Sequence, residues 1–202
     1  MTEHVATQRE FLATELTPRL DEAVAGRAQV WVVDAAHCVS GTDLCCLWSI
    51  PRVFVRAASG RQRFNVLGAW DAASRAFVSV TNTTVVNTDT VCQLLRKLAA
   101  VGSVVLDNAR YQRNQVAQAL AAELSITLVY LPSYSPNLNL IERLWRFLKR
   151  KAVYGKYHPH CASFKTAIED TLSQLSTTYA EPLASLMTLN FQEFDDVSLL
   201  AA

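Results

Sequence analysis

Residues 126–148 read Ile-Thr-Leu-Val-Tyr-Leu-Pro-Ser-Tyr-Ser-Pro-Asn-Leu-Asn-Leu-Ile-Glu-Arg-Leu-Trp-Arg-Phe-Leu, and this stretch indicates the class of fold. It begins with an apolar run that is typical of a short strand. A segment rich in Pro, Ser and Asn follows and indicates a rigid loop. Beyond the loop, apolar residues recur at helical spacing, at Leu140, Leu144, Trp145 and Leu148. The stretch therefore predicts a strand, a rigid loop and a helix in succession.

The remaining sequence predicts more strands and helices around this unit. Apolar runs predict strands at residues 29–34, 53–56, 63–70, 76–81 and 103–107. Helical patterns occur at residues 5–25, 87–98, 113–124, 163–175 and 182–189, with a kink expected at Pro18 and a stop at Gly102. Strands followed by alternating strands and helices predict an α/β fold. Its mixed sheet combines an antiparallel meander with parallel strands and is flanked by helices.

Composition favours a single globular domain over residues 1–202. Half of the residues are hydrophobic and 18% are charged, which excludes a disordered chain. No apolar run approaches the roughly 20 residues that a membrane span needs. The first ten residues do not have the pattern of a signal peptide, so we expect a cytoplasmic protein without membrane contact.

Three carboxylates occupy positions suited to metal-dependent phosphoryl transfer. Asp34 and Asp107 end predicted strands, and Glu142 lies at the start of a predicted helix. Each also has a structural interpretation. Asp34 would bind backbone donors at its strand end, Asp107 would form an Asx turn with Asn108, and Glu142 would form a capping box with Asn139. The 34 residues between Asp107 and Glu142 accommodate one helix, one strand and one loop, which returns the chain to the same edge of the sheet.

Basic residues are concentrated around the helix that carries Glu142. Seven of them lie between residues 142 and 165, against one acid, although the net charge of the chain is only +1. Such local positive charge favours a nucleic-acid backbone as partner, and a solvated helix face is the alternative. The proposed DNA-binding residues are Arg143, Arg146, Lys149 and Arg150, and a second basic cluster comprises Arg52, Arg56, Arg61 and Arg63.

The five cysteines have no C-x-x-C spacing and predict buried or free thiols in a reducing compartment. A zinc site is the alternative. Its ligands would come from His37, Cys38, Cys45, Cys46, His158, His160 and Cys161, whose spacing matches no common zinc motif.

On these motifs the chain resembles a DDE transposase of the bacterial insertion-sequence branch of the Tc–mariner superfamily. The matching stretches are residues 33–37, 60–68, 105–112 and 131–145. The resemblance extends over about residues 8–192. It implies a ribonuclease-H-like fold and a metal-dependent DNA endonuclease and strand transferase that acts at insertion-element ends.

The resemblance also implies roles for individual residues and partners. Asp34, Asp107 and Glu142 would be catalytic and would bind two Mg²⁺ (or Mn²⁺) ions. Asn108 would orient Asp107 or a water, and His37 would contact a substrate phosphate, with a turn-forming Asn and a structural His as the alternatives. The partners would be double-stranded DNA, both element ends and target, and a second copy of the chain.

Two departures from the family pattern suggest a second hypothesis. The usual helix-turn-helix region is absent upstream of the catalytic part, where only a lead-in helix at about residues 5–25 precedes it. A separately encoded helix-turn-helix segment would then complete the protein. The lead at residues 98–103 is also short, and a displaced strand would keep Asp107 from the metals. The alternative is therefore a catalytically silent transposase remnant that acts only in DNA binding or self-association.

Overall fold

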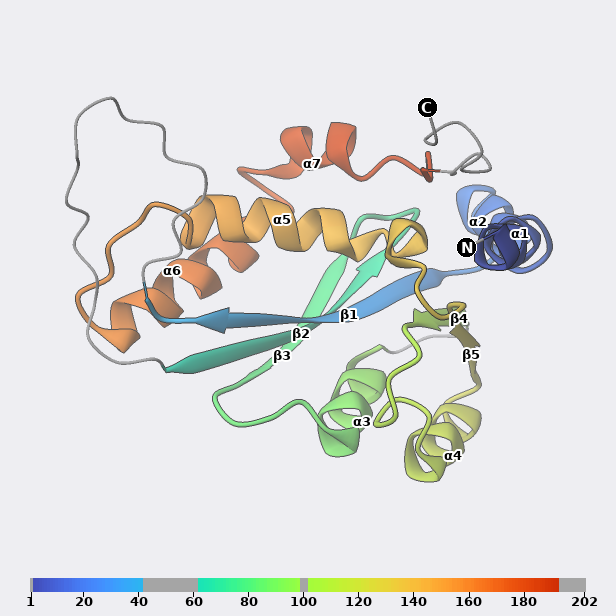
Figure 1. The fold of residues 1–202 in the computed structure, drawn as a ribbon, viewed down its shortest axis with the longest axis horizontal. Coiled ribbons are helices and arrows are strands. Elements are labelled where there is room, and N and C mark those ends of the chain that lie inside the picture. Colours follow the sequence, from blue (N-terminus) through green and yellow to red (C-terminus); the bar gives the residue numbers. More distant parts are fainter. Residues whose placement is uncertain (1, 42–61, 99–101, 193–202) are drawn as a thin grey trace.

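A mixed sheet with helices on both faces forms the fold (Figure 1). The structure, a computed structural model, describes residues 2–41, 62–98 and 102–192. Within these ranges the sheet has five strands in the order β3-β2-β1-β4-β5. They are β1 (Val30–Val39), β2 (Arg63–Asp71), β3 (Phe77–Asn82), β4 (Gly102–Leu106) and β5 (Ile126–Tyr130). The mixed α/β sheet predicted from the sequence is therefore confirmed.

The sheet has an antiparallel half and a parallel half. The strands β1, β2 and β3 form the antiparallel meander, while β4 pairs in parallel with β1 and with β5. The strand expected at residues 53–56 lies outside the described residues, so that prediction is not tested. Gly102 begins β4, and the expectation that it ends the preceding helix is wrong. A Cβ at Gly102 would lie 2.5 Å from the carbonyl oxygen of Gln29, so the close approach of β4 to that backbone requires glycine.

Helices cover both faces of the sheet and divide the core into two clusters. One face carries α5 (Ile141–Ala152), with α2 (Thr17–Val24), α6 (Cys161–Ser173) and α7 (Ala180–Leu186) contributing to the same cluster. The opposite face carries α3 (Thr88–Lys97) and α4 (Gln115–Glu123), as Figure 1 shows. Side chains alternate along β1, so Val32 and Ala36 belong to the α5 cluster while Val33 faces α3 and α4. This alternation determines which side chains of β1 can reach α5.

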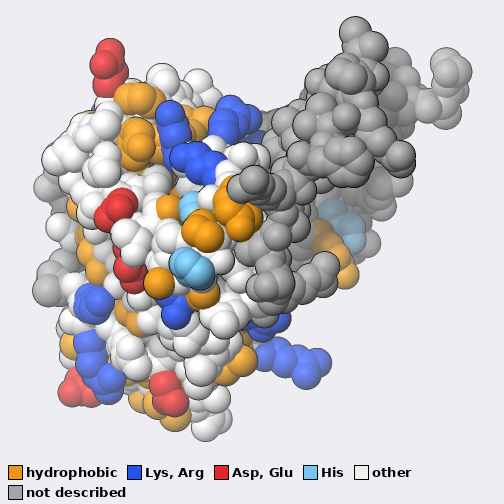
Figure 2. All heavy atoms as spheres, turned by 90° about the vertical axis from the view of Figure 1, so that its left-hand side faces the viewer, with side chains coloured by type: hydrophobic (Ala, Val, Ile, Leu, Met, Phe, Trp, Pro, Cys, Tyr) orange, Lys and Arg blue, Asp and Glu red, His pale blue; other side chains and the backbone are white. Residues whose placement is uncertain are grey.

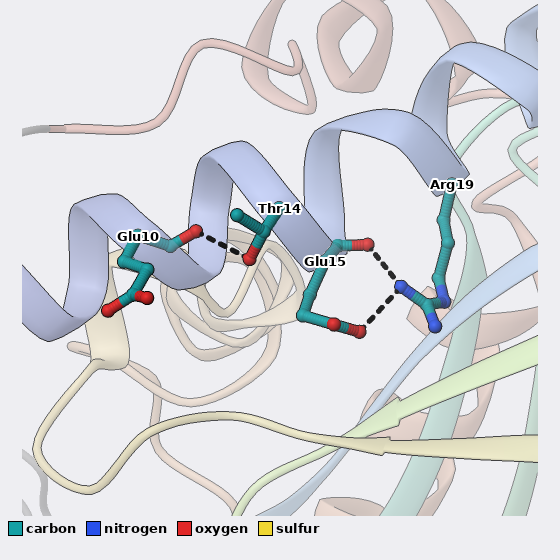
Figure 3. A network of polar contacts seen from close by, with 4 residues as sticks. All are labelled: Glu10, Thr14, Glu15 and Arg19. Carbon is teal, nitrogen blue, oxygen red and sulfur yellow. Dashed lines mark hydrogen bonds and ion pairs between the residues drawn. The ribbon is translucent and has the colours of Figure 1, made fainter.

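The lead-in helix is present but is not one regular helix. It consists of α1 (Thr2–Phe11), a π-helical turn η1 (Leu12–Leu16) and α2. The amide of Thr17 donates to the carbonyl of Leu12, a bond that spans five residues, and Pro18 follows at the start of α2. Because proline has no amide hydrogen, the regular bond pattern fails here, as expected. Nearby, the Arg19 guanidinium donates to the carbonyl and the carboxylate of Glu15 at 2.6 and 2.8 Å, and the Thr14 hydroxyl donates to the carbonyl of Glu10 (Figure 3).

The other helices begin at residues that the sequence largely predicts. Asn87 caps α3 in a capping box with Thr90, and Asn114 caps α4. The loop before α5 contains a short 3-10 turn, η2 (Pro136–Leu138). In the described part of the chain no helix is long and apolar enough to cross a membrane.

Candidate active site

Asp34 lies in the middle of β1 and not at its end. The strand continues five residues beyond Asp34, to Val39, because β2 pairs with it along its whole length. The expectation of a strand-end position was therefore wrong. Asp34 lies directly opposite Gly68 of β2 and is 9% exposed, and its place in the alternation directs it toward the face that α5 covers.

The indole of Trp145 contacts the carboxylate of Asp34 directly. Trp145 is buried on α5, and its Nε1–H donates to Oδ2 of Asp34 at 3.0 Å. Asp34 also accepts a hydrogen bond from the backbone of Ala35. Trp145 packs as expected, but its hydrogen bond joins residues 111 positions apart. No local pattern in the sequence indicates this contact.

Asp107 follows the last residue of β4 and reaches the same place in the sheet. The parallel register pairs Val33 with Leu106, so the next residues along the two strands are Asp34 and Asp107. One oxygen of Asp107 accepts a hydrogen bond from the amide of Ala109 at 3.1 Å, which is the Asx turn that we weighed as an alternative. The short lead at residues 98–103 therefore does not displace the strand, although residues 99–101 lie outside the described part.

Glu142 lies in the first turn of α5 and does not cap that helix. Leu140 is the N-cap residue, and no side chain binds the free amides there. The structural alternative for Glu142, a capping box with Asn139, is contradicted, because the amide of Glu142 donates to the backbone carbonyl of Asn139 and not to its side chain. Asn139 is 5% exposed, and its Oδ1 accepts no hydrogen bond from any described residue. Both side chains are thus available to the cavity described next.

One cavity of about 270 Å³ brings the three acids together. Asp34, Asp107 and Glu142 all line it, as do Asn108 and Asn139. The loop from Leu131 to Pro136 completes the wall, and no Lys, Arg or His is among the described lining residues. The acids come from β1, the end of β4 and the start of α5, so the three predicted carboxylates share one site.

The electrostatics of the cavity reflect this concentration of acids. Burial raises the pKa of Asp34 to about 7, and the charges of Glu142 and Asp107 add to the effect. Hydrogen bonds from Ala35 and Trp145 act in the opposite direction, because they favour the charged form. Burial and the charges of Asp107 and Asp34 also raise the pKa of Tyr111 to about 12. The site is negative, without a basic counter-charge on its described walls, and this favours a cation.

The donor set fits hard divalent ions better than zinc. Carboxylate and amide oxygens are the ligands of Mg²⁺, which often takes only one or two carboxylates and leaves the remaining positions to water and substrate phosphates. The described residues contain no group of three His, Cys, Asp or Glu that could hold one metal ion together. The zinc hypothesis gains no support: Cys38 is buried, and Cys45 and Cys46 lie outside the described residues.

His37 does not line the acidic cavity. It is three positions after Asp34 on the same strand, so it lies on the opposite face of the sheet. Its Nδ1 is 2.8 Å from Oδ1 of Asn65, and the Nδ2 of Asn65 donates to Oδ1 of Asn82 and to the carbonyl of Thr84. This arrangement matches the structural alternative for His37.

The four predicted DNA-binding residues differ in their surroundings. Arg143 is used within the chain: its guanidinium donates to the backbone carbonyls of Leu186, Thr188 and Asn190, in and just after α7. Partial burial, followed by the charge of Arg146, lowers the pKa of Arg143. The other three are Arg146 and Arg150, which are exposed, and Lys149, which is half-buried.

A second cavity of about 430 Å³ lies between α5 and α7. Its walls include Arg143, Arg146 and Arg150 from α5 and Ser185 and Asn190 from in and after α7.

On the face of the molecule at the α6 end, Lys and Arg side chains form separate groups with acidic side chains nearby, not one continuous patch (Figure 2). The second basic cluster predicted from the sequence retains only Arg63 in the described part of the chain.

Part of the sequence matches a known protein family. Residues 49–165, more than half of the chain, match the model of the DDE superfamily endonucleases. The chain belongs to the DDE superfamily endonucleases. The match includes Asp107 and Glu142, whereas Asp34 lies before it. No curated protein matches the sequence significantly.

Solved structures of Mos1 transposase share the fold of this DDE-family chain. A pre-cleavage Mos1 transpososome superposes with a TM-score of 0.63 at 13% identity, over 94% of this chain and 63% of that chain. The Mos1 strand transfer complex has a TM-score of 0.60 at 15% identity, over 94% and 62%. A mariner Mos1 paired-end complex with Mg has a TM-score of 0.58 at 13% identity, over 96% and 64%. The family match confirms the resemblance to DDE endonucleases. The solved structures confirm the ribonuclease-H-like fold, which the chain shares with Mos1 transposase, and the chain spans less than two thirds of the Mos1 chains.

Proposed function

We propose that this chain is the catalytic domain of a transposase, which cuts DNA at insertion-element ends and joins the cut ends to a target. The observation that carries the proposal is the shared cavity of Asp34, Asp107 and Glu142 in a chain of the DDE endonuclease family. In this proposal the chain forms one domain and acts on DNA in the cytoplasm.

In this proposal Asp34, Asp107 and Glu142 hold two Mg²⁺ ions, for which Mn²⁺ can substitute. When bound, such ions activate the attacking oxygen and stabilise the leaving oxygen of a phosphodiester. The chain fixes the relative positions of the three acids. Adjacent strands of the sheet position Asp34 and Asp107, and α5 brings Glu142 to them. Asn139 Oδ1 offers a further buried acceptor at the same wall, and Asn108 lies beside Asp107.

The Asp34 carboxyl must lose its proton before it can bind a cation. Its pKa of about 7 means that the metal-free site at neutral pH holds a proton on Asp34 about half of the time. Metal binding then displaces that proton, since a ligating carboxylate is deprotonated. We therefore expect metal affinity to increase from pH 6 to pH 8.

The decisive experiment is divalent-ion-dependent nicking of DNA that carries the element ends. Wild-type protein is expected to nick with Mg²⁺ or Mn²⁺ and not with EDTA. Asp107→Ala should abolish nicking, because it removes a ligand at the centre of the site. Asp170→Ala is the matched control: Asp170 is exposed on α6 and does not line the cavity. Equal nicking by wild type and Asp107→Ala would show that these acids do not carry the reaction.

The alternative proposal is a catalytically silent remnant that only binds DNA or associates with itself. It predicts DNA binding or self-association without nicking under any divalent ion. The alignment of Asp107 with Asp34 in the sheet favours the active enzyme, because a displaced strand was the main reason to expect a silent one.

We propose that Arg146, Lys149 and Arg150 contact the DNA backbone next to Glu142. All three lie on α5, whereas the donors of Arg143 are largely used by the segment around α7. Each neutralised phosphate contributes about 0.9 to the slope of log affinity against log salt for B-form DNA. The double variant Arg146→Ala/Arg150→Ala should therefore reduce that slope by about two. An unchanged slope would place the DNA elsewhere.

We also propose that the active assembly contains two copies of the chain, by analogy with the Mos1 paired-end complexes. A helix-turn-helix segment, separately encoded, would add recognition of the element ends. Mass measurement of the protein with and without end DNA tests the dimer: a 1:1 complex that nicks at full rate would contradict it.

A further inference from the structure

Trp145 is the residue outside the three acids that is most directly tied to the site. It lies one helical turn after Glu142 on α5 and is 3% exposed. Its only polar atom, Nε1, donates at 3.0 Å to Oδ2 of Asp34. Helix α5 therefore supplies one acid to the cavity and binds a second acid through the indole.

The sheet is shaped to receive this indole. Gly68, which pairs with Asp34, lies beneath the ring, and a Cβ on Gly68 would be 2.5 Å from Cη2 of Trp145. Phe77 on the next strand meets the indole edge-on, with ring centres 6.2 Å apart and an angle of 82°. Contacts with Gly68 and Phe77 thus fix the position of the ring, and its N–H donates to Asp34.

The hydrogen bond restricts what Asp34 can do. The N–H donor at Oδ2 fixes the rotation of the carboxylate and so fixes where its other oxygen points. Partners that orient the ligands of a metal typically change its affinity ten- to a hundred-fold when they are removed. A side chain that only filled space at this position would not need a donor aimed at the acid.

We propose that Trp145 is a positioning residue, which holds the Asp34 carboxylate in a fixed orientation for a divalent ion. The inference rests on the proposed function, because it assumes that the acidic cavity binds such an ion. It adds a residue from the core of α5 to the site, and it makes Gly68 necessary because the glycine leaves room for the indole.

The test compares two tryptophan-to-phenylalanine variants in the full chain. Trp145→Phe keeps an aromatic ring and removes the N–H that binds Asp34. Trp70→Phe is the matched control, because Trp70 is also buried and its Nε1 has no partner among the described residues. Free Mn²⁺ is measured by electron paramagnetic resonance during a titration. We expect Mn²⁺ affinity to fall about ten- to a hundred-fold in Trp145→Phe and less than about two-fold in Trp70→Phe.

Activity gives a second signature. The Mn²⁺ concentration for half-maximal nicking should rise in Trp145→Phe, and saturating Mn²⁺ should restore most of the maximal rate. A purely structural defect would not be corrected by the ion. In wild-type protein, the indole N–H resonance of Trp145 should shift when Mg²⁺ is added, and the resonance of Trp70 should not. The resonances are measured in wild-type protein, so the result does not depend on the stability of a variant. The variants serve only to assign the two resonances.

The outcomes separate this inference from the proposed function. Wild-type protein that binds no Mn²⁺ would overturn both. Wild-type protein that binds Mn²⁺ and loses nicking in Asp107→Ala, but whose affinity is unchanged by Trp145→Phe, would overturn this inference alone. A Trp145 resonance that does not respond to saturating Mg²⁺ would do the same.

Discussion

Replacement of Asp34 by Asn should stabilise the metal-free protein, and the gain should grow with pH. Asn keeps an oxygen that can accept the Trp145 N–H but carries no charge. The pKa of Asp34 is raised from its ordinary 3.8 to about 7, mainly by burial. Between these values the folded wild type binds more protons than the unfolded chain, so wild-type stability falls as pH rises. Below about pH 4 the carboxyl is neutral in both states and this loss is absent.

The size of this loss of stability follows from the interval between the ordinary and the raised pKa of Asp34. The loss accumulates at about 1.4 kcal/mol per pH unit over about three units, which gives about 4 kcal/mol above pH 7. The Asn side chain does not titrate, so its own packing and hydrogen bonding contribute equally at every pH. The difference in the free energy of unfolding, variant minus wild type, should therefore rise from pH 4 to pH 7 and level off above pH 7.

Urea unfolding in EDTA, followed by circular dichroism at several pH values, measures this difference. Mg²⁺ should then stabilise wild type at pH 8 more than the variant, because it binds the folded site. A difference that is flat or that falls with pH would refute the reasoning, since it would mean that burial does not raise the pKa of Asp34.

Three further predictions concern the supports of the site and fold, each measured by urea unfolding. Gly68→Ala should lower the free energy of unfolding by about 1–3 kcal/mol, because the added methyl overlaps Trp145. Gly41→Ala should change it little, because no atom of the described residues lies within 4 Å of the added methyl. Arg143→Ala should cost about 1–2 kcal/mol and speed amide hydrogen exchange in the segment after α7, whose carbonyls lose their donor; unchanged exchange there would contradict this. Asn87→Ala should cost about 1 kcal/mol through loss of the α3 cap, and no loss would mean that the capping box is not needed.

Much of the fold could be predicted because its signals are local. Apolar runs identified β2, β3, β4 and β5 to within a residue or two, and Asn87 identified the start of α3. That the three acids line one cavity could be predicted for a related reason. The 34-residue interval between Asp107 and Glu142 contains one helix, one strand and one loop, and such a unit returns to the same edge of a sheet.

The errors arose where a long-range partner decides the local structure. The length of β1 depends on pairing with β2, so Asp34 could not be placed in mid-strand from its own neighbours. Once β1 runs to Val39, alternation alone puts His37 on the opposite face. Glu142 looked like a helix cap in sequence, but the loop geometry makes Leu140 the N-cap residue and leaves the acid facing the cavity.

The sequence by itself thus determined the positions of most described strands and helices and singled out the three acids as candidates, because spacing and side-chain type act over a few residues. Only the tertiary structure decided how these acids are held. The bond from Trp145 to Asp34 joins positions 111 apart, and the bonds from Arg143 to the segment around α7 span more than 40. Such contacts depend on which surfaces pack together, and burial of the whole apolar face of α5 against the sheet determines that packing.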